Sequence, residues 1–139
     1  MPYDEWVTAL TGRTLNSWFG WQRNHYDRAV HFLFGLMLAI PARELLEGVA
    51  GVSRRWSYRL AVVLLMACSS LYELIEWAAA IVFGGDLGMR SLGTQGDEWD
   101  GQRDMALAAF GAVLAMLGAA AYSVARGKLA GIRGRDPRW

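Results

Sequence analysis

The apolar run from Leu60 to Phe83 constrains this chain most, because it is long enough to cross a bilayer and yet contains two carboxylates. Glu73 lies near the centre of the run, and Glu76 follows about one turn later. An ionised carboxylate at mid-membrane costs roughly 3 kcal/mol on insertion scales, whereas a leucine returns only about 0.5 kcal/mol. Such residues therefore usually face a protein interior or a wet cavity, where they are paired. The run predicts a membrane protein with a buried polar site.

The composition agrees with a single integral membrane domain over residues 1–139. Hydrophobic residues make up 54% of the chain, and the charged 19% is concentrated between the apolar runs. The formal net charge of +1 argues against a nucleic-acid partner, which would require a strong basic excess. The single cysteine, Cys68, excludes a disulfide framework or a zinc-type cysteine cluster within one chain. The N-terminus also lacks the basic end and apolar core of a cleavable signal peptide.

Three spans are expected, at about residues 27–48, 58–83 and 104–125, with an outer loop at 84–103 between the last two. The first is interrupted by Pro41, which a membrane helix tolerates when neighbours satisfy the freed backbone groups. The third carries a stripe of small residues that would let helices approach closely: Ala108, Gly111, Ala112, Ala115, Gly118 and Ala119. The predicted fold is an all-α membrane protein, a small bundle of about three transmembrane helices.

The segment 1–22 is too polar to span a membrane and too aromatic for a simple tail. Its tryptophans, Trp6, Trp18 and Trp21, suit the level of the lipid headgroups. We expect an N-terminal interfacial segment, with a frayed aromatic terminus as the alternative.

Asp27 and His31 are four residues apart at the mouth of the first span and so share a helix face. An acid and a histidine stacked in this way can hold a metal or relay a proton. The simpler alternative is a hydrogen bond between the two that orients the helix end, and without a partner site it is preferred.

The loop before the third span supplies the remaining acids. Asp97, Asp100 and Asp104 lie on one face if the helix starts at Asp97, and negative charge suits a helix N-terminus. A solvated acidic loop is the alternative. The positive charges at residues 54, 55 and 59 and after the third span predict a cytoplasmic C-terminus, which places the acids towards the outer leaflet.

The chain resembles the YjdF-type bacterial inner-membrane proteins from about residue 18 to residue 118. The motifs that carry this resemblance are Arg23-Asn24-His25-Tyr26-Asp27-Arg28, His31-Phe32, Arg43-Glu44, Tyr72-Glu73-Leu74-Ile75-Glu76-Trp77, and Gly93-Thr94-Gln95-Gly96-Asp97-Glu98-Trp99-Asp100 with Gln102 and Asp104. A weaker similarity extends to the VanZ-like proteins of glycopeptide resistance. The resemblance implies a multi-pass protein of the inner (plasma) membrane and implies site residues, but no activity. Longer YjdF-type proteins usually have further spans before the histidine motif, which leaves open whether this chain needs copies of itself or another subunit to enclose the site.

Three functions fit these residues, and the sequence leaves open whether the protein is an enzyme. The first is a metal-assisted enzyme acting on a lipid or cell-envelope substrate, with a divalent ion as cofactor. Its catalytic candidates are Asp27, His31, Glu73 and Glu76, and its metal-ligand candidates are Asp97, Asp100, Asp104, Glu73 and His31. The second is a proton or ion pathway through Glu73 and Glu76, which three spans could enclose only in an oligomer. The third is a structural or assembly subunit whose acids pair with Arg28, Arg43 or Arg103 as interhelical fasteners.

Overall fold

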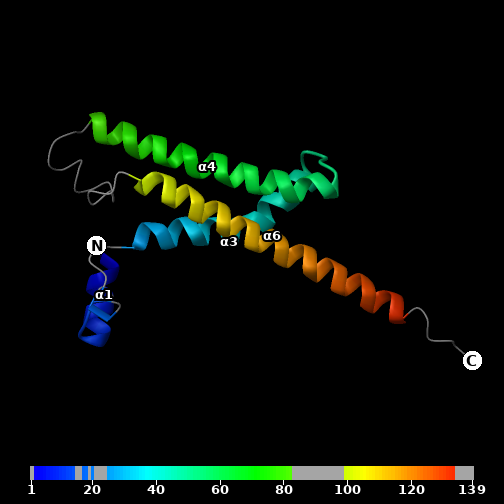
Figure 1. Ribbon diagram of the computed structural model, residues 1–139, viewed down its shortest axis with the longest axis horizontal. Helices are drawn as coiled ribbons and strands as arrows, with labels where there is room; N and C mark the ends of the chain where they lie inside the picture. The colour runs from blue at the N-terminus through cyan, green and yellow to red at the C-terminus, as the bar shows by residue number, and fades with distance from the viewer. Residues whose placement is uncertain (1, 15–16, 19, 21–24, 83–98, 134–139) are drawn as a thin grey trace, which may run out of the picture.

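The computed structural model describes residues 2–14, 17–18, 20, 25–82 and 99–133. Its main elements are helices: α1 (Pro2–Thr11), α3 (Tyr26–Gly48), α4 (Arg54–Val82) and α6 (Asp100–Arg133), and no strand occurs among the described residues (Figure 1). Within these residues, α3, α4 and most of α6 are long and apolar enough to cross a membrane. The expected all-α fold with three transmembrane helices is therefore confirmed.

The turn between α3 and α4 makes an antiparallel hairpin of these two helices. Gly51 has a φ of 64°, a backbone conformation that glycine adopts without strain. The backbone N–H of Val52 donates to the carbonyl of Leu46 at 2.9 Å, which satisfies one of the last carbonyls of α3. At this end of the bundle, the Ser57 hydroxyl of α4 donates to Glu47 of α3 at 2.5 Å. The hairpin is thus fixed by hydrogen bonds as well as by packing.

Two glycines allow α3 and α6 to cross in backbone contact (Figure 1). A Cβ atom added to Gly35 would lie 1.9 Å from the carbonyl oxygen of Ala108, and one added to Gly111 would lie 2.2 Å from the carbonyl oxygen of Phe32. No side chain fits at either position without moving a helix. The crossing explains why the small residues of the predicted third span are needed.

The core of the bundle is small and consists mainly of alanine. Its buried members are Ala39, Ala61, Leu65, Ala112, Ala115 and Met116. Larger apolar side chains on all three long helices point outwards and are exposed, among them Met37, Ile75 and Leu117. This distribution is expected for helices surrounded by lipid, where the hydrocarbon tails are as apolar as leucine.

Helix α6 extends before the apolar span that was expected from about residue 104. It begins at Asp100, where negative charge suits the first turn of a helix. The packed stripe of small residues ends before Gly118, which is exposed and has nothing within 4 Å of an added Cβ atom. Ser123 of α6 still accepts a hydrogen bond of 2.6 Å from Arg54 of α4, and the C-terminal end of α6 extends away from the other helices (Figure 1).

Helix α1 does not pack against the other three helices in the described part of the chain. Trp6 and Leu10 are exposed on it. An interfacial location for this segment stays a prediction.

Candidate functional site

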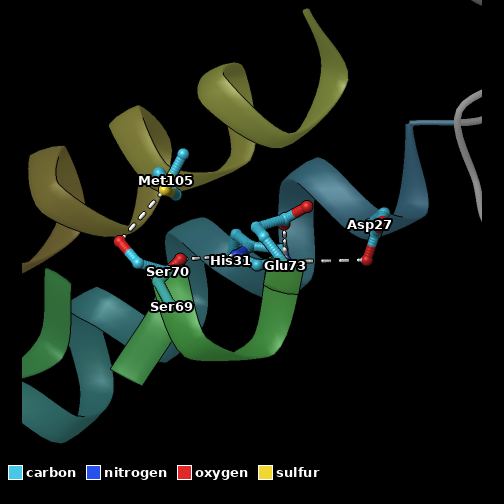
Figure 2. A network of polar contacts seen from close by, with 6 residues as sticks. All are labelled: Asp27, His31, Ser69, Ser70, Glu73 and Met105. Carbon is cyan, nitrogen blue, oxygen red and sulfur yellow. Dashed lines mark hydrogen bonds and ion pairs between the residues drawn. The ribbon is translucent and has the colours of Figure 1, made fainter. Parts of the chain in front are cut away.

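His31 lies in the second turn of α3 and is only 5% exposed. Its ring contacts two residues of α4, as Figure 2 shows: Nδ1 lies 3.0 Å from the Ser69 hydroxyl oxygen, and Nε2 lies 3.2 Å from Oε1 of Glu73. Ser69 and Glu73 are four residues apart, so the same face of α4 presents both to the ring. The orientation of the imidazole is therefore determined by α4.

Asp27 is close to the same ring but does not hydrogen-bond it. Its Oδ1 lies 3.9 Å from Nε2 of His31, which is beyond hydrogen-bonding distance. The preferred sequence-based alternative, an Asp27–His31 hydrogen bond that orients the helix end, is not what the geometry shows. Nε2 instead faces two carboxylates, those of Asp27 and Glu73 (Figure 2).

Helix α6 brings two more acids to this end of the bundle. Asp104 is 1% exposed, and its carboxylate, the Asp27 carboxylate and the His31 ring each offer a ligand atom within 4.8 Å of the others. Asp100, one turn earlier, accepts a contact of 3.2 Å from Nη2 of Arg28 on α3. Of these two acids, Asp104 thus belongs to a potential metal-binding group and Asp100 to an ion pair.

Gly101 is a contributor that the sequence analysis missed. A Cβ atom at this position would lie 2.7 Å from Oε2 of Glu73, so the absence of a side chain lets the Glu73 carboxylate approach α6. The available signal was a glycine placed directly after Asp100, in the midst of the acids. The contact of Ser69 with His31 was missed as well.

A cavity of about 500 Å³ lies between α4 and the start of α6. Its polar lining includes the carboxylates of Asp27, Glu73, Glu76, Asp100 and Asp104. Trp77 is exposed and forms part of the wall. Ser70 also lines it and donates to the sulfur of Met105 at 3.0 Å (Figure 2).

The structure therefore gathers most of the residues that the sequence singled out. Asp27, Glu73, Glu76, Asp100 and Asp104 share the cavity, and His31 adjoins it through its contact with Glu73. Asp97 lies outside the described residues. Carboxylate oxygens with one imidazole nitrogen form a donor set suited to a divalent cation.

Three membrane-length helices with an acidic site buried at one end define a multi-pass integral membrane protein. The chain belongs to a family of predicted membrane proteins, DUF2238, whose family model matches residues 1–125. It is also 41% identical over 107 residues to inner membrane protein YjdF of Escherichia coli (strain K12), which confirms the resemblance to the YjdF-type proteins. The match covers 76% of this chain and 51% of that relative, so the chain spans about half the relative's length. No solved structure matches the chain significantly.

Proposed function

We propose that this protein is a metal-dependent membrane enzyme that acts on a lipid or cell-envelope substrate at the outer face of the bacterial inner membrane. The observation that carries the proposal is the group formed by Asp27, His31 and Asp104, whose ligand atoms lie within 4.8 Å of one another although they come from two helices. Three ionisable side chains are seldom brought together inside a membrane without a partner that offsets their cost.

The contacts of His31 support a role as a metal ligand. Histidines that bind a metal usually donate the N–H of the other ring nitrogen to a neighbouring oxygen, which fixes the tautomer. Here Nδ1 is 3.0 Å from the Ser69 hydroxyl, and Nε2 faces the carboxylates. With Nδ1–H donating to Ser69, Nε2 would be free to bind a cation together with Asp27 and Asp104.

The remaining acids would serve the reaction. A divalent ion in this position would polarise a phosphoryl or carbonyl oxygen or activate a water molecule. Glu73, 3.2 Å from Nε2 of His31, is placed to complete the ligand set or to act as general base, and Glu76 lines the same cavity.

Localisation and topology belong to the same proposal. The similarity to inner membrane protein YjdF of E. coli supports a location in the inner membrane. The basic residues between α3 and α4 and those near the C-terminus favour the cytoplasmic side for both, which puts the acidic cavity towards the outer leaflet. A second copy of the chain or another membrane subunit would cover the exposed apolar faces that lipid does not.

A structural role is the second candidate, because one specific contact favours it. Arg28 and Asp100 pair across α3 and α6 at 3.2 Å, as an interhelical fastener would. On this interpretation the acids hold the helices together, and neutralising any one of them would lower the yield of folded protein.

Elemental analysis of the protein purified in mild detergent tests the proposal, with Asp104→Asn and Glu73→Gln beside the wild type. We expect about one divalent ion per wild-type chain and at least a tenfold loss in Asp104→Asn, since a ligand is removed while the fold is kept. Glu44→Gln, an exposed carboxylate on α3, is the matched control and should keep the ion. Folded, metal-free wild-type protein would refute the enzyme proposal and leave the structural role.

A further inference from the structure

A second cavity, of about 240 Å³, lies between α3 and α4 on another side of His31. We call it the α3–α4 groove. Its lining comes from two short stretches, Val30, His31 and Phe34 of α3 and Cys68, Ser69 and Tyr72 of α4. None of the carboxylates of the acidic cavity takes part in this lining.

Two polar groups of the groove are already paired with each other. Nδ1 of His31 lies 3.0 Å from the Ser69 hydroxyl oxygen. The ring of Tyr72 also packs edge-on against the ring of His31, with the centroids 5.6 Å apart. An occupant of the groove would therefore meet satisfied polar atoms and apolar surface.

The surroundings of the groove determine what can fill it. Both helices that form it are long and apolar enough to cross a membrane, and Val30, Cys68 and Tyr72 are exposed at its rim. The adjoining medium is therefore lipid, and an apolar cavity takes up apolar groups in preference to water. The volume is below the roughly 300 Å³ at which pockets for whole small molecules begin, so it suits part of a lipid better than an entire ligand.

The groove adjoins the acidic cavity through His31. This residue lines the groove, and its Nε2 lies 3.2 Å from Oε1 of Glu73, which lines the acidic cavity. A molecule seated in the groove would thus lie against His31, one of the residues to which the proposed chemistry belongs.

We propose that the α3–α4 groove binds one acyl chain of a membrane lipid, and that the enzyme's substrate is a lipid held by this chain while its headgroup region reaches the acidic cavity. This inference rests on the proposed function and narrows its substrate class to a lipid that enters sideways from the bilayer. A water-soluble envelope precursor would have no acyl chain to occupy the groove.

Photo-crosslinking tests the groove directly. The probe is phosphatidylethanolamine with a diazirine in one acyl chain, incorporated into nanodiscs that contain the full chain, with the adducts mapped by mass spectrometry. We expect adducts on Phe34 and Cys68 at several times the level found at Val63 and Met66, which are exposed on α4 outside the groove. Cys68→Phe should fill the groove and reduce the Phe34 adduct at least fivefold, whereas Val63→Phe, the matched control, should leave it unchanged.

The outcomes separate this inference from the metal proposal, because metal content is measured on the same samples. Concentrated adducts support the groove whether or not the protein contains metal. Adducts spread evenly over the lipid-facing residues of the wild type would overturn the groove even if one ion per chain is found. Adducts absent from the groove but present elsewhere would also overturn it, and would point to a helix of a second copy as the occupant.

Discussion

His31 and Glu73 join α3 to α4 at the polar end of the bundle, with Nε2 and Oε1 3.2 Å apart. The other ring nitrogen is held by Ser69, so two residues of α4 determine how the imidazole of α3 is oriented. Nε2 is therefore directed at a space bordered by the carboxylates of Asp27 and Glu73. The imidazole is thus already oriented so that Nε2 could bind a cation in that space.

Ser69→Ala should weaken metal binding without removing a ligand. The alanine cannot accept the Nδ1–H of His31, so the ring loses the contact that fixes its tautomer and orientation. Loss of such an outer contact typically lowers metal affinity by about 10- to 100-fold. Titration of the metal-stripped protein by calorimetry measures the change. Ser53→Ala, an exposed serine before α4, is the control, and equal affinities for both variants would show that Ser69 does not position the ring.

Gly101→Ala should displace the Glu73 carboxylate. The new methyl group would lie 2.7 Å from Oε2, and the side chain can swing away because it is flexible. We therefore expect the thermal unfolding midpoint to stay within a few degrees of the wild type while metal affinity falls at least severalfold. Gly127→Ala, which has nothing within 4 Å of the added Cβ atom, should change neither property. Unaltered metal affinity in Gly101→Ala would argue against a role for Glu73 at the site.

Gly35→Ala should destabilise the bundle strongly. Its Cβ atom would lie 1.9 Å from the carbonyl oxygen of Ala108, and a backbone atom cannot move aside as a side chain can. Overpacking in a core costs about 1–3 kcal/mol, and we expect a value at or above the upper end. Gly118→Ala is the matched control on α6, where the open surroundings permit a gain of up to about 1 kcal/mol from helix propensity. Unfolding by sodium dodecyl sulfate in mixed micelles measures both, and similar stabilities for the two variants would contradict the close crossing.

A double-mutant cycle can determine how much the Arg28–Asp100 pair contributes to the stability of the fold. The Arg28 side chain is 20% exposed and that of Asp100 is 6% exposed, so solvent screens the pair only partly. We expect Arg28→Ala and Asp100→Ala to show a coupling of about 1–3 kcal/mol in the same unfolding assay. Asp100→Asn should then lose stability more than metal, whereas Asp104→Asn should lose metal more than stability. Full loss of metal in Asp100→Asn with no coupling would make Asp100 a ligand instead of a fastener.

The membrane fold was predictable because its signals are local. Each long helix is marked by an apolar run, and Glu73 and Glu76 required a polar site because carboxylates inside a span are costly. The grouping of Asp27 with His31 followed from helical spacing alone. The acids before the third span were expected at a helix N-terminus because negative charge suits that position, and the described part of α6 begins at Asp100.

The partners across helices could not be predicted in the same way. Spacing shows which residues share a face of one helix, but the rotation of that helix against its neighbours decides what the face meets. His31 could have met several α4 residues, and only the packing of α3 on α4 selects Ser69 and Glu73. Gly101 was overlooked for a related reason, since a missing side chain has no chemistry of its own until another element approaches it.

The helix crossing at Gly35 and Gly111 and the polar site at the end of the bundle are formed by different residues. Backbone atoms of α3 and α6 meet there without help from any charged group. The close approach at the crossing therefore does not depend on the acids at the end of the bundle, where the Arg28–Asp100 pair adds a second link between the same two helices. A scaffold of this kind is a practical starting point for engineering: the same three helices could be given a different set of ligands at the polar end and would still assemble.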